Sequence, residues 1–279
     1  MHITCWGTRG SIPVSGADTV KYGGDTTCFE VSGIDGTRLI IDAGTGIRSL
    51  GKKLIDERAT QCHLLFTHTH WDHILGLTAF APIFSNELHI TVPVFPSQLD
   101  YLEKTLGALF KAPTFPVPFT RIGQRFTFQP VLVSPLAIGP FTITTIGISH
   151  PNQGLGFRIT EEDRSFVFLT DNELGMVHDG GETLESYAQF AMGCDLLLHD
   201  AEYTPEEYAL RKSWGHSSWS DALNLARKAQ VKRFGFIHHN AEHSDEQVDA
   251  MVQACSKQIA QAGEPLSCFA ASPHQPITL

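Results

Sequence analysis

His68-Thr69-His70-Trp71-Asp72-His73 is the stretch of this 279-residue chain that decides its fold. It follows an apolar run at 63–67 that is typical of a buried strand. Residues i and i+2 of an extended chain point the same way, so the first two histidines can bind one cation. Asp72 and His73 come as the chain turns into a helix, and they can face a second cation nearby. Imidazole and carboxylate ligands suit zinc, and also iron or manganese.

Three polar residues at the ends of later apolar strands are candidates to complete the two cation sites. They are His150, Asp171 and His238. Taken singly, each has another explanation: His150 precedes a proline and could be a turn residue, and Asp171 could cap a helix. His239 competes with His238. Because a strand turns successive side chains to opposite faces, only one of these two histidines can face the cations.

The order of apolar segments along the chain predicts the fold class. We expect strands at 1–6, 26–32, 37–42, 63–67, 88–92, 141–148, 157–160, 166–170, 196–199 and 234–238, and helices at 46–57, 97–110, 183–192, 205–212, 218–229 and 244–262. The proline-rich segment 112–119 is expected to be an ordered loop. Strands and helices alternate through both halves, which favours a layered α/β sandwich with the chemistry at one end of the strands. We expect a single domain over 1–279.

Composition limits the classes of partner. Lys and Arg number 20 against 30 Asp and Glu, and the net charge is −10. This balance argues against a long polyanionic substrate but not against a small phosphate ester. No run of about 18 apolar residues occurs, and the N-terminus lacks the features of a secretory signal, so we expect a cytoplasmic protein that does not cross a membrane. The six scattered cysteines are expected to be reduced, buried thiols.

The order HxHxDH, His, Asp, His, between Gly7 and His238, resembles that of the metallo-β-lactamase fold hydrolases. The resemblance implies a four-layer αββα sandwich, with two mixed sheets face to face and helices outside. It also implies a role for each ligand: His68, His70 and His150 would hold one metal, Asp72, His73 and His238 the other, and Asp171 would bridge them. Asp42, an acid before a glycine at a strand end, would support the ligand histidines by hydrogen bonding, or would only cap a turn.

Two later segments resemble the paired motifs of ribonuclease Z and its relatives. They are His199-Asp200-Ala201-Glu202-Tyr203 and Gly215-His216-Ser217-Ser218. In that group the acid and the histidine, here Asp200 and His216, act together at the scissile phosphate. A purely structural role for His216 at a helix N-terminus is the alternative.

The N-terminal segments narrow the resemblance further. Gly7-Thr8-Arg9-Gly10-Ser11 and Gly23-Gly24-Asp25-Thr26-Thr27-Cys28 resemble the phosphoribosyl cyclic phosphodiesterase branch. Arg9 is a candidate phosphate contact, or part of a simple turn. The long arm of the tRNA-processing ribonucleases is missing, since only a hairpin separates His150 from Asp171.

These observations predict a dinuclear metal-dependent hydrolase, in the first place a phosphodiesterase acting on a small or cyclic phosphodiester. A metal-bridging hydroxide would attack phosphorus, and His216, held by Asp200, would protonate the leaving alkoxide. Asp72 is counted with them as catalytic as well as a ligand. Two Zn²⁺ are expected, with Mn²⁺ or Fe²⁺ as alternatives.

Several alternatives remain open at this stage. A related enzyme could hydrolyse a thioester, lactone or β-lactam, or process RNA as ribonuclease Z does. A di-iron redox partner of a flavoprotein and a non-catalytic binding module are further possibilities. Nucleic acid and membranes are not expected as partners, and a homodimer is suggested by the family alone.

Overall fold

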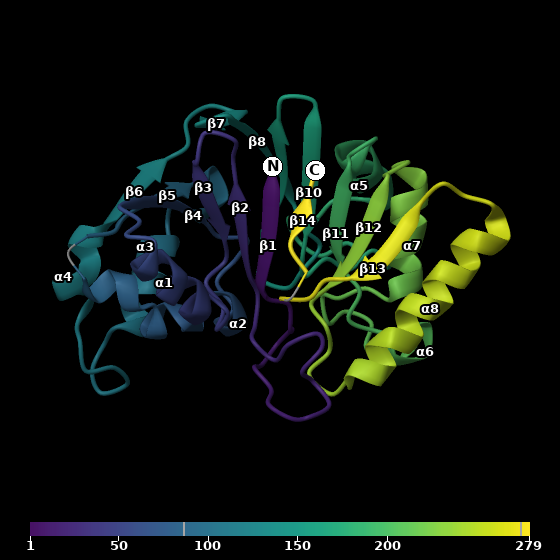
Figure 1. Cartoon of the computed structure of the whole chain (residues 1–279), viewed down its shortest axis with the longest axis horizontal. Coiled ribbons are helices and arrows are strands. Elements are labelled where there is room, and N and C mark those ends of the chain that lie inside the picture. The colour runs from purple at the N-terminus through teal and green to yellow at the C-terminus, as the bar shows by residue number, and fades with distance from the viewer. Residues whose placement is uncertain (86, 274) are drawn as a thin grey trace.

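Two seven-stranded β-sheets face each other in the computed structural model of the chain, which describes residues 1–85, 87–273 and 275–279 (Figure 1). The first sheet has the order β14 (Ile277–Thr278), β1 (His2–Gly7), β2 (Cys28–Ser32), β3 (Arg38–Ile41), β4 (Gln61–Leu65), β5 (His89–Val94), β6 (Phe126–Pro130). The second has the order β13 (Ser267–Ala270), β12 (Arg233–Ile237), β11 (Leu196–Asp200), β10 (Arg164–Leu169), β9 (Leu155–Glu161), β8 (Phe141–Gly147), β7 (Leu136–Ile138).

The two sheets share one pattern of strand directions. In the first sheet β1 and β3 pair antiparallel with β2, and β3 to β6 run parallel. In the second, β7 to β10 are antiparallel and β10 to β13 are parallel. The parallel strands of each sheet therefore end at a common edge, which is where polar residues from different strands can meet.

Helices form the outer layers, one set on each sheet (Figure 1). The first set is α1 (Ile47–Asp56), α2 (Trp71–Ile74), α3 (Leu102–Leu109) and α4 (Phe119–Ile122). The second set is α5 (Leu184–Ala191), α6 (Pro205–Ala209), α7 (Trp219–Lys228) and α8 (Asp245–Ala262). Short 3-10 turns lie at Leu75–Ala79, Ala81–Phe84, Pro96–Gln98 and Gly123–Arg125. This is the four-layer αββα sandwich, and the predicted fold class is confirmed.

The alternation of side chains along the buried strands divides the core into three clusters. In β3, Leu39 and Ile41 point between the sheets, whereas Ile40 points to the helices of the first half. In β11, Leu198 points between the sheets and Leu197 to the helices of the second half. Both faces of these strands are buried, which explains why they are continuous apolar runs rather than alternating ones.

The predicted elements are present, with shifts at several ends. The helix expected at 97–110 is shorter, because Pro96 opens a 3-10 turn and Tyr101, with φ −131°, interrupts the helical path before α3. The segment 112–118 is irregular, as expected, but Phe119, which was predicted to belong to the same loop, begins α4. The turn into a helix expected at Asp72 and His73 is α2, whereas β6, β7, β13, β14 and α4, all of them short, were not predicted.

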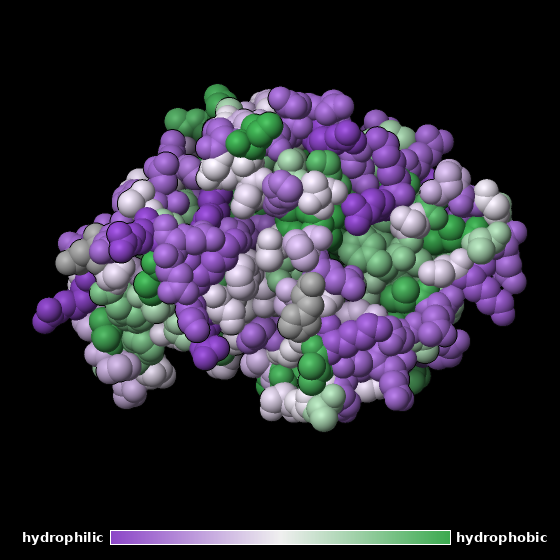
Figure 2. Space-filling view, viewed as in Figure 1, coloured by the Kyte–Doolittle hydropathy of each residue, from purple (hydrophilic) through white to green (hydrophobic). Residues whose placement is uncertain are grey.

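The exterior of the molecule is mainly polar in the view of Figure 2, and most of the cysteine side chains lie in the interior. Hydrophilic residues cover most of the face shown in Figure 2, and hydrophobic ones appear there in small groups. All six cysteines are free, and five of them are buried. No helix in the described part of the chain is long and apolar enough to cross a membrane.

Candidate metal centre

The quoted stretch, His68 to His73, lies directly after β4, where the chain passes from extended backbone into α2. His70 is still extended, with φ −63° and ψ 155°, and α2 begins at the next residue. The two histidines before the helix and the Asp72–His73 pair within its first turn therefore project from different backbone geometries. This change of geometry lets one short segment supply two neighbouring groups of ligands.

The first group consists of three imidazoles, from His68, His70 and His150. Their ring centroids lie 4.5 to 5.0 Å apart. The donor atoms that face one another all lie within 4.8 Å. Histidine nitrogens at this spacing can share one divalent cation.

The second group contains Asp72, His73, Asp171 and His238, all buried. The Nε2 atom of His73 lies 3.2 Å from a carboxylate oxygen of each aspartate, and so does the Nε2 atom of His238. Two carboxylates and two imidazoles thus point at one small volume between the sheets.

Asp171 connects the two groups. Its Oδ1 lies 3.8 Å from Nε2 of His68 and 3.8 Å from Nε2 of His150. It also contacts the second group, as described above. The structure therefore brings together all seven residues that the sequence suggested as ligands. His239 points elsewhere, because its Nε2 lies 2.9 Å from the carbonyl oxygen of Ala271.

The ends of the strands adopt an unusual backbone geometry at the site. Asp42, Asp171 and His238 have φ values of +62°, +51° and +59°. This left-handed conformation ends each strand abruptly and turns the side chain into the site. Gly10 makes room for one of them, since a Cβ at that position would lie 2.2 Å from Nδ1 of His238.

The imidazoles of the first group are held in their neutral form. Burial lowers the pKa of His68 well below its ordinary value, and nearby His73 adds to the shift. Burial also lowers the pKa of His150 to about 4. Neutral imidazole is the form that binds metals, so these rings suit a ligand role.

The aspartates of the second group are held in their charged form. Burial favours the neutral acid, but neighbouring histidines outweigh it and keep the pKa of Asp72 and of Asp171 well below the ordinary value. Two buried carboxylates in one place need positive charge close by, from protonated histidines or from cations.

Two buried nitrogen atoms test whether divalent metals fit here. Nε2 of His68 and Nε2 of His73 have no hydrogen-bond partner among the described residues, although both are buried. Buried polar atoms are normally paired, so unpaired nitrogens facing carboxylates fit cation ligands. The donor set of nitrogen and carboxylate oxygen atoms suits divalent transition metals.

The ligand histidines are oriented through their other ring nitrogen. Nδ1 of His73 lies 2.7 Å from Asp42, which also accepts hydrogen bonds from the backbone N–H and hydroxyl of Thr67. Nδ1 of His150 lies 2.9 Å from the carbonyl oxygen of Gly215. Nδ1 of His238 lies 2.9 Å from Glu202. Such contacts fix the ring and the tautomer of a metal ligand.

His216 and Asp200 lie beside this donor set. Nδ1 of His216 is 2.7 Å from Asp200, and the ring stacks on that of His238 with centroids 4.7 Å apart. Burial alone would lower the pKa of His216, but the carboxylates of Glu202 and Asp200 raise it to about 9. A donor atom of His216 also lies within 4.8 Å of those of His150 and Asp171.

Two buried glutamates beside the centre were not predicted to have a role. Glu202 lies within the quoted 199–203 segment and contacts both His238 and His216. The side chain of Glu173 is fully buried. Its carboxylate lies 2.8 Å from each of four groups, namely the Tyr208 hydroxyl, the backbone N–H groups of Ser213 and Gly215, and Nε2 of His178. It thereby holds the loop that carries His216.

Arg9 requires a correction, because the sequence suggested it as a phosphate contact. Its side chain is buried and donates hydrogen bonds to the carbonyl oxygens of Gly23, Asn240 and His243. The guanidinium holds three loops together and does not face the metal centre. The neighbouring Ser11 does reach it, since its backbone N–H donates to Asp72 at 2.9 Å.

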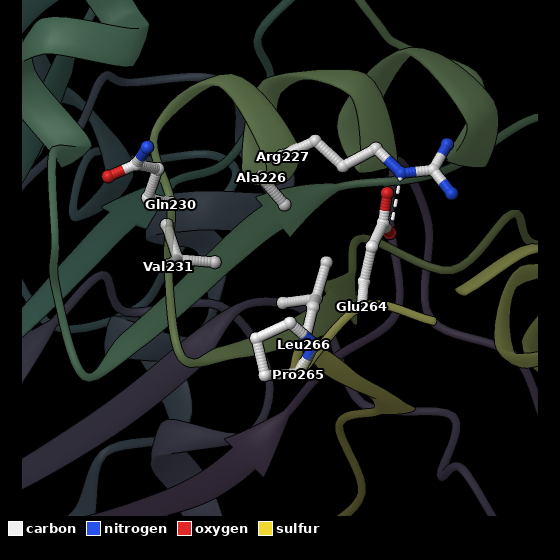
Figure 3. Close-up of a pocket in the computed structure, with 7 residues that line it drawn as sticks. All are labelled: Ala226, Arg227, Gln230, Val231, Glu264, Pro265 and Leu266. Atoms are coloured by element: carbon white, nitrogen blue, oxygen red, sulfur yellow. Dashed lines mark hydrogen bonds and ion pairs between the residues drawn. The ribbon is translucent and has the colours of Figure 1, made fainter. Parts of the chain in front are cut away.

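A cavity of about 410 Å³ at the other end of the second sheet is unrelated to this centre. It is lined by residues 226, 227, 230, 231 and 264–266, and Figure 3 shows the partly exposed Arg227–Glu264 ion pair at its edge, with an Nε–Oε2 distance of 2.8 Å. These residues precede β12 and β13, whereas His238 follows β12. The cavity therefore lies at the amino ends of the strands and the metal centre at their carboxyl ends.

Comparisons with known proteins agree with this geometry. The family described as the beta-lactamase superfamily domain matches residues 37–239. Ribonuclease Z of Haloferax volcanii is 26% identical over 300 aligned positions, which cover 91% of this chain and 89% of the relative. The chain belongs to the metallo-β-lactamase superfamily, with relatives in its ribonuclease Z branch.

Solved structures show the same fold at low identity. The metallo-β-lactamase fold protein YhfI of Bacillus subtilis superposes with a TM-score of 0.70 at 17% identity, over 99% of both chains. A diphosphatase of the PhnP family superposes with a TM-score of 0.66 at 17% identity, over 100% of this chain and 97% of the other.

The first prediction concerns metal content. We expect about two divalent ions per chain after dialysis against zinc and then against metal-free buffer, because seven donors exceed what one tetrahedral ion uses. Elemental analysis measures this ratio. Asp171→Ala should retain one ion or fewer, since its carboxylate reaches both groups. A wild-type ratio that stays at one would contradict a two-metal centre.

The second prediction separates the two adjacent histidines after β12. His238→Ala should lose metal, because Nε2 of His238 faces Asp72 and Asp171. His239→Ala should keep it, because that ring contacts the backbone oxygen of Ala271 and the ring of Tyr22 and faces neither aspartate. Metal content of both purified variants decides the question, and the opposite pattern would sink this assignment.

The third prediction concerns Glu173. Glu173→Gln keeps the size of the side chain but replaces one acceptor oxygen by an amide nitrogen, so the 213–215 loop loses at least one buried hydrogen bond. We expect the free energy of unfolding to fall by about 1–3 kcal/mol. Misplacement of His216 should lower kcat by roughly 10- to 100-fold. Urea unfolding measures the loss of stability, and steady-state kinetics measures the loss of kcat.

Glu182→Gln, at an exposed glutamate, is the control for Glu173→Gln and should change neither quantity. Unchanged stability and turnover in Glu173→Gln itself would show that this carboxylate does not hold the loop.

Proposed function

We infer that the chain hydrolyses a small or cyclic phosphodiester with the help of two divalent cations, zinc in the first place. The observation that carries this proposal is the position of the His216–Asp200 pair, 2.7 Å apart, beside a donor set suited to two cations. Cleavage of a phosphodiester releases an alkoxide that must gain a proton, and such a pair can supply it. A lactone also releases an alkoxide, so the preference for a phosphodiester rests on the ribonuclease Z relatives.

The donor set divides into the two groups described above. His68, His70 and His150 would hold one cation, Asp72, His73 and His238 the other, and Asp171 would contact both. When bound, two such cations lower the pKa of a coordinated water and offset the charge on the phosphoryl oxygens. Asp72 is counted as catalytic because it would hold one of these cations. The backbone N–H of Ser11 donates to its carboxylate and holds it in position.

His216 is the proton donor in this proposal. Its Nδ1 is engaged by Asp200, so Nε2 is the nitrogen left to exchange a proton with the substrate. Asp200 is itself held by the backbone N–H groups of Glu202 and Ser217, at 3.1 Å each. The carboxylate therefore keeps the ring oriented and favours its protonated form, which is the form that can protonate a leaving oxygen.

Two features support a small substrate. Only the β9–β10 hairpin lies between His150 and Asp171, so the chain has no extended arm there to bind the body of a large RNA. The net charge of −10 also provides no general attraction for a long polyanion.

Ribonuclease Z-like RNA processing is the second candidate, and the curated relatives favour it. The Haloferax volcanii relative, a ribonuclease Z, aligns over 91% of this chain. That likeness weighs against the expectation that nucleic acid is not a partner. A short RNA segment could reach the centre without an arm, so the two candidates differ in what is cleaved rather than in how.

The fourth prediction concerns His216 and the leaving group. With zinc-loaded enzyme, His216→Ala should lower turnover of an alkyl phosphodiester by roughly 10²–10⁴-fold, the usual contribution of a general acid. The loss should be smaller with bis-p-nitrophenyl phosphate, because p-nitrophenolate needs little protonation. Steady-state kinetics on both esters measures the difference, and metal content should not change.

His89→Ala, an exposed histidine on β5, is the matched control and should leave both activities unchanged. Equal losses on the two esters would remove His216 from the acid role. Cleavage of precursor tRNA more efficient than that of small diesters would replace the first candidate by the second, and a dominant β-lactamase activity would overturn both.

A further inference from the structure

A neutral pocket of about 410 Å³ opens directly beside the metal centre. Thr69 and Trp71, on either side of the candidate ligand His70, form its near edge. Its remaining lining residues are Ile74, Leu75, Thr78, Thr105, Ala108, Leu109, Thr114 and Phe115. None of the ten carries a charge. A group in this pocket would therefore be uncharged, in contrast to the anion that the cations attract.

The short helix α2 lies between the pocket and the candidate metal ligands. Asp72 and His73 point to the metal centre, whereas Trp71 and Ile74 line the pocket. The opposite wall is one face of α3, where Thr105, Ala108 and Leu109 follow the i, i+3, i+4 spacing of a helix. The pocket thus borders the turn that carries Asp72 and His73, and Thr69 and Trp71 place it next to His70 in the chain.

Trp71 provides a flat aromatic surface at the entrance. It is 75% exposed, and no hydrogen bond or ring contact joins its indole to another residue in the described part of the chain. A tryptophan left this exposed does not contribute to the core. An indole face that is open to solvent suits stacking by a planar ring.

Hydroxyl groups in the pocket offer polar contacts without charge. The hydroxyl groups of Thr78 and Thr114 donate to the backbone oxygens of Leu75 and Lys111. Those of Thr69 and Thr105 have no partner among the described residues. Two unused hydroxyls beside an aromatic surface match the edge of a heteroaromatic base, which carries both donors and acceptors.

We propose that this pocket binds the nucleobase of a nucleotide phosphodiester, stacked on Trp71. The proposal rests on the phosphodiesterase function and narrows its substrate to esters that carry a base. The phosphate would lie at the metal centre and the base between α2 and α3. A sugar phosphate without a base would leave the pocket empty and bind less tightly.

The test compares two ligands that differ only in the base, AMP and ribose 5-phosphate, by calorimetric titration of the zinc-loaded protein. The wild type should bind AMP more tightly by at least roughly fivefold, the smaller end of the range for a base stacked on an aromatic side chain. Trp71→Ala should remove this preference by weakening AMP alone. Trp71→Phe, which keeps an aromatic ring, should retain most of it.

A second variant tests the pocket without changing a chain neighbour of His70. Ala108→Phe fills the pocket from an exposed position on α3, and it should weaken AMP binding without affecting ribose 5-phosphate. Leu132→Ala, at an 87% exposed leucine outside the pocket, should bind both ligands as the wild type does. Two bound zinc ions in every variant confirm that the centre is intact.

Equal affinity for AMP and ribose 5-phosphate in the wild type, or no binding of either, would overturn the proposal. So would a preference for AMP that survives in both Trp71→Ala and Ala108→Phe. Phenyl phosphate bound as tightly as AMP would show a general aryl site rather than one for a base. Failure of the phosphodiesterase function would appear separately, as an absence of ester hydrolysis by the wild type, because the binding measurement needs no turnover.

Discussion

The buried carboxylate of Asp171 is the constraint on which the rest of the site depends. It is 2% exposed, and a charge removed from water to this degree must be compensated by its neighbours. The compensation comes from both halves of the chain: His73 belongs to α2 beside the first sheet, and His238 follows β12 in the second. The carboxyl ends of the two sheets are therefore held against each other by electrostatics as well as by the apolar layer between them. Asp42 and Glu202 extend the same pairing outward, each orienting one of these rings.

The backbone at these points is held in a conformation that the fold must stabilise. Asp42, Asp171 and His238 all lie in the left-handed region, which disfavours residues other than glycine on the order of 1–3 kcal/mol each. The strands that lead to them are buried on both faces, so the packing of neighbouring side chains keeps the geometry in place. The free energy gained in the apolar layers thus offsets the strain and the buried charge at the strand ends. Backbone strain and buried charge at one place are expected where side chains are oriented for binding or chemistry rather than for stability.

Local patterns predicted the fold, and the candidate ligands that they indicated lie close together in the structure. Distant contacts explain what was missed. The His68–His73 stretch and the polar ends of the strands can be read from neighbouring residues, and so can the alternation of strands and helices. Glu173 left no such signal, because the groups it accepts from lie 35 to 42 residues away, apart from His178. Arg9 was interpreted wrongly because its partners Asn240 and His243 lie more than 230 residues away. The strands β13 and β14 are too short to show a periodicity, and they are defined only by their pairing with β12 and β1.

Within the single turn of α2, neighbouring residues project to opposite sides of the backbone. Asp72 and His73 point to the centre, and Trp71 and Ile74 point away from it, so neither position 71 nor position 74 supplies a donor atom. In an evolving lineage, this arrangement lets the chemistry stay constant while the surface beside it diversifies one residue at a time. The same donors can then serve enzymes with different tasks.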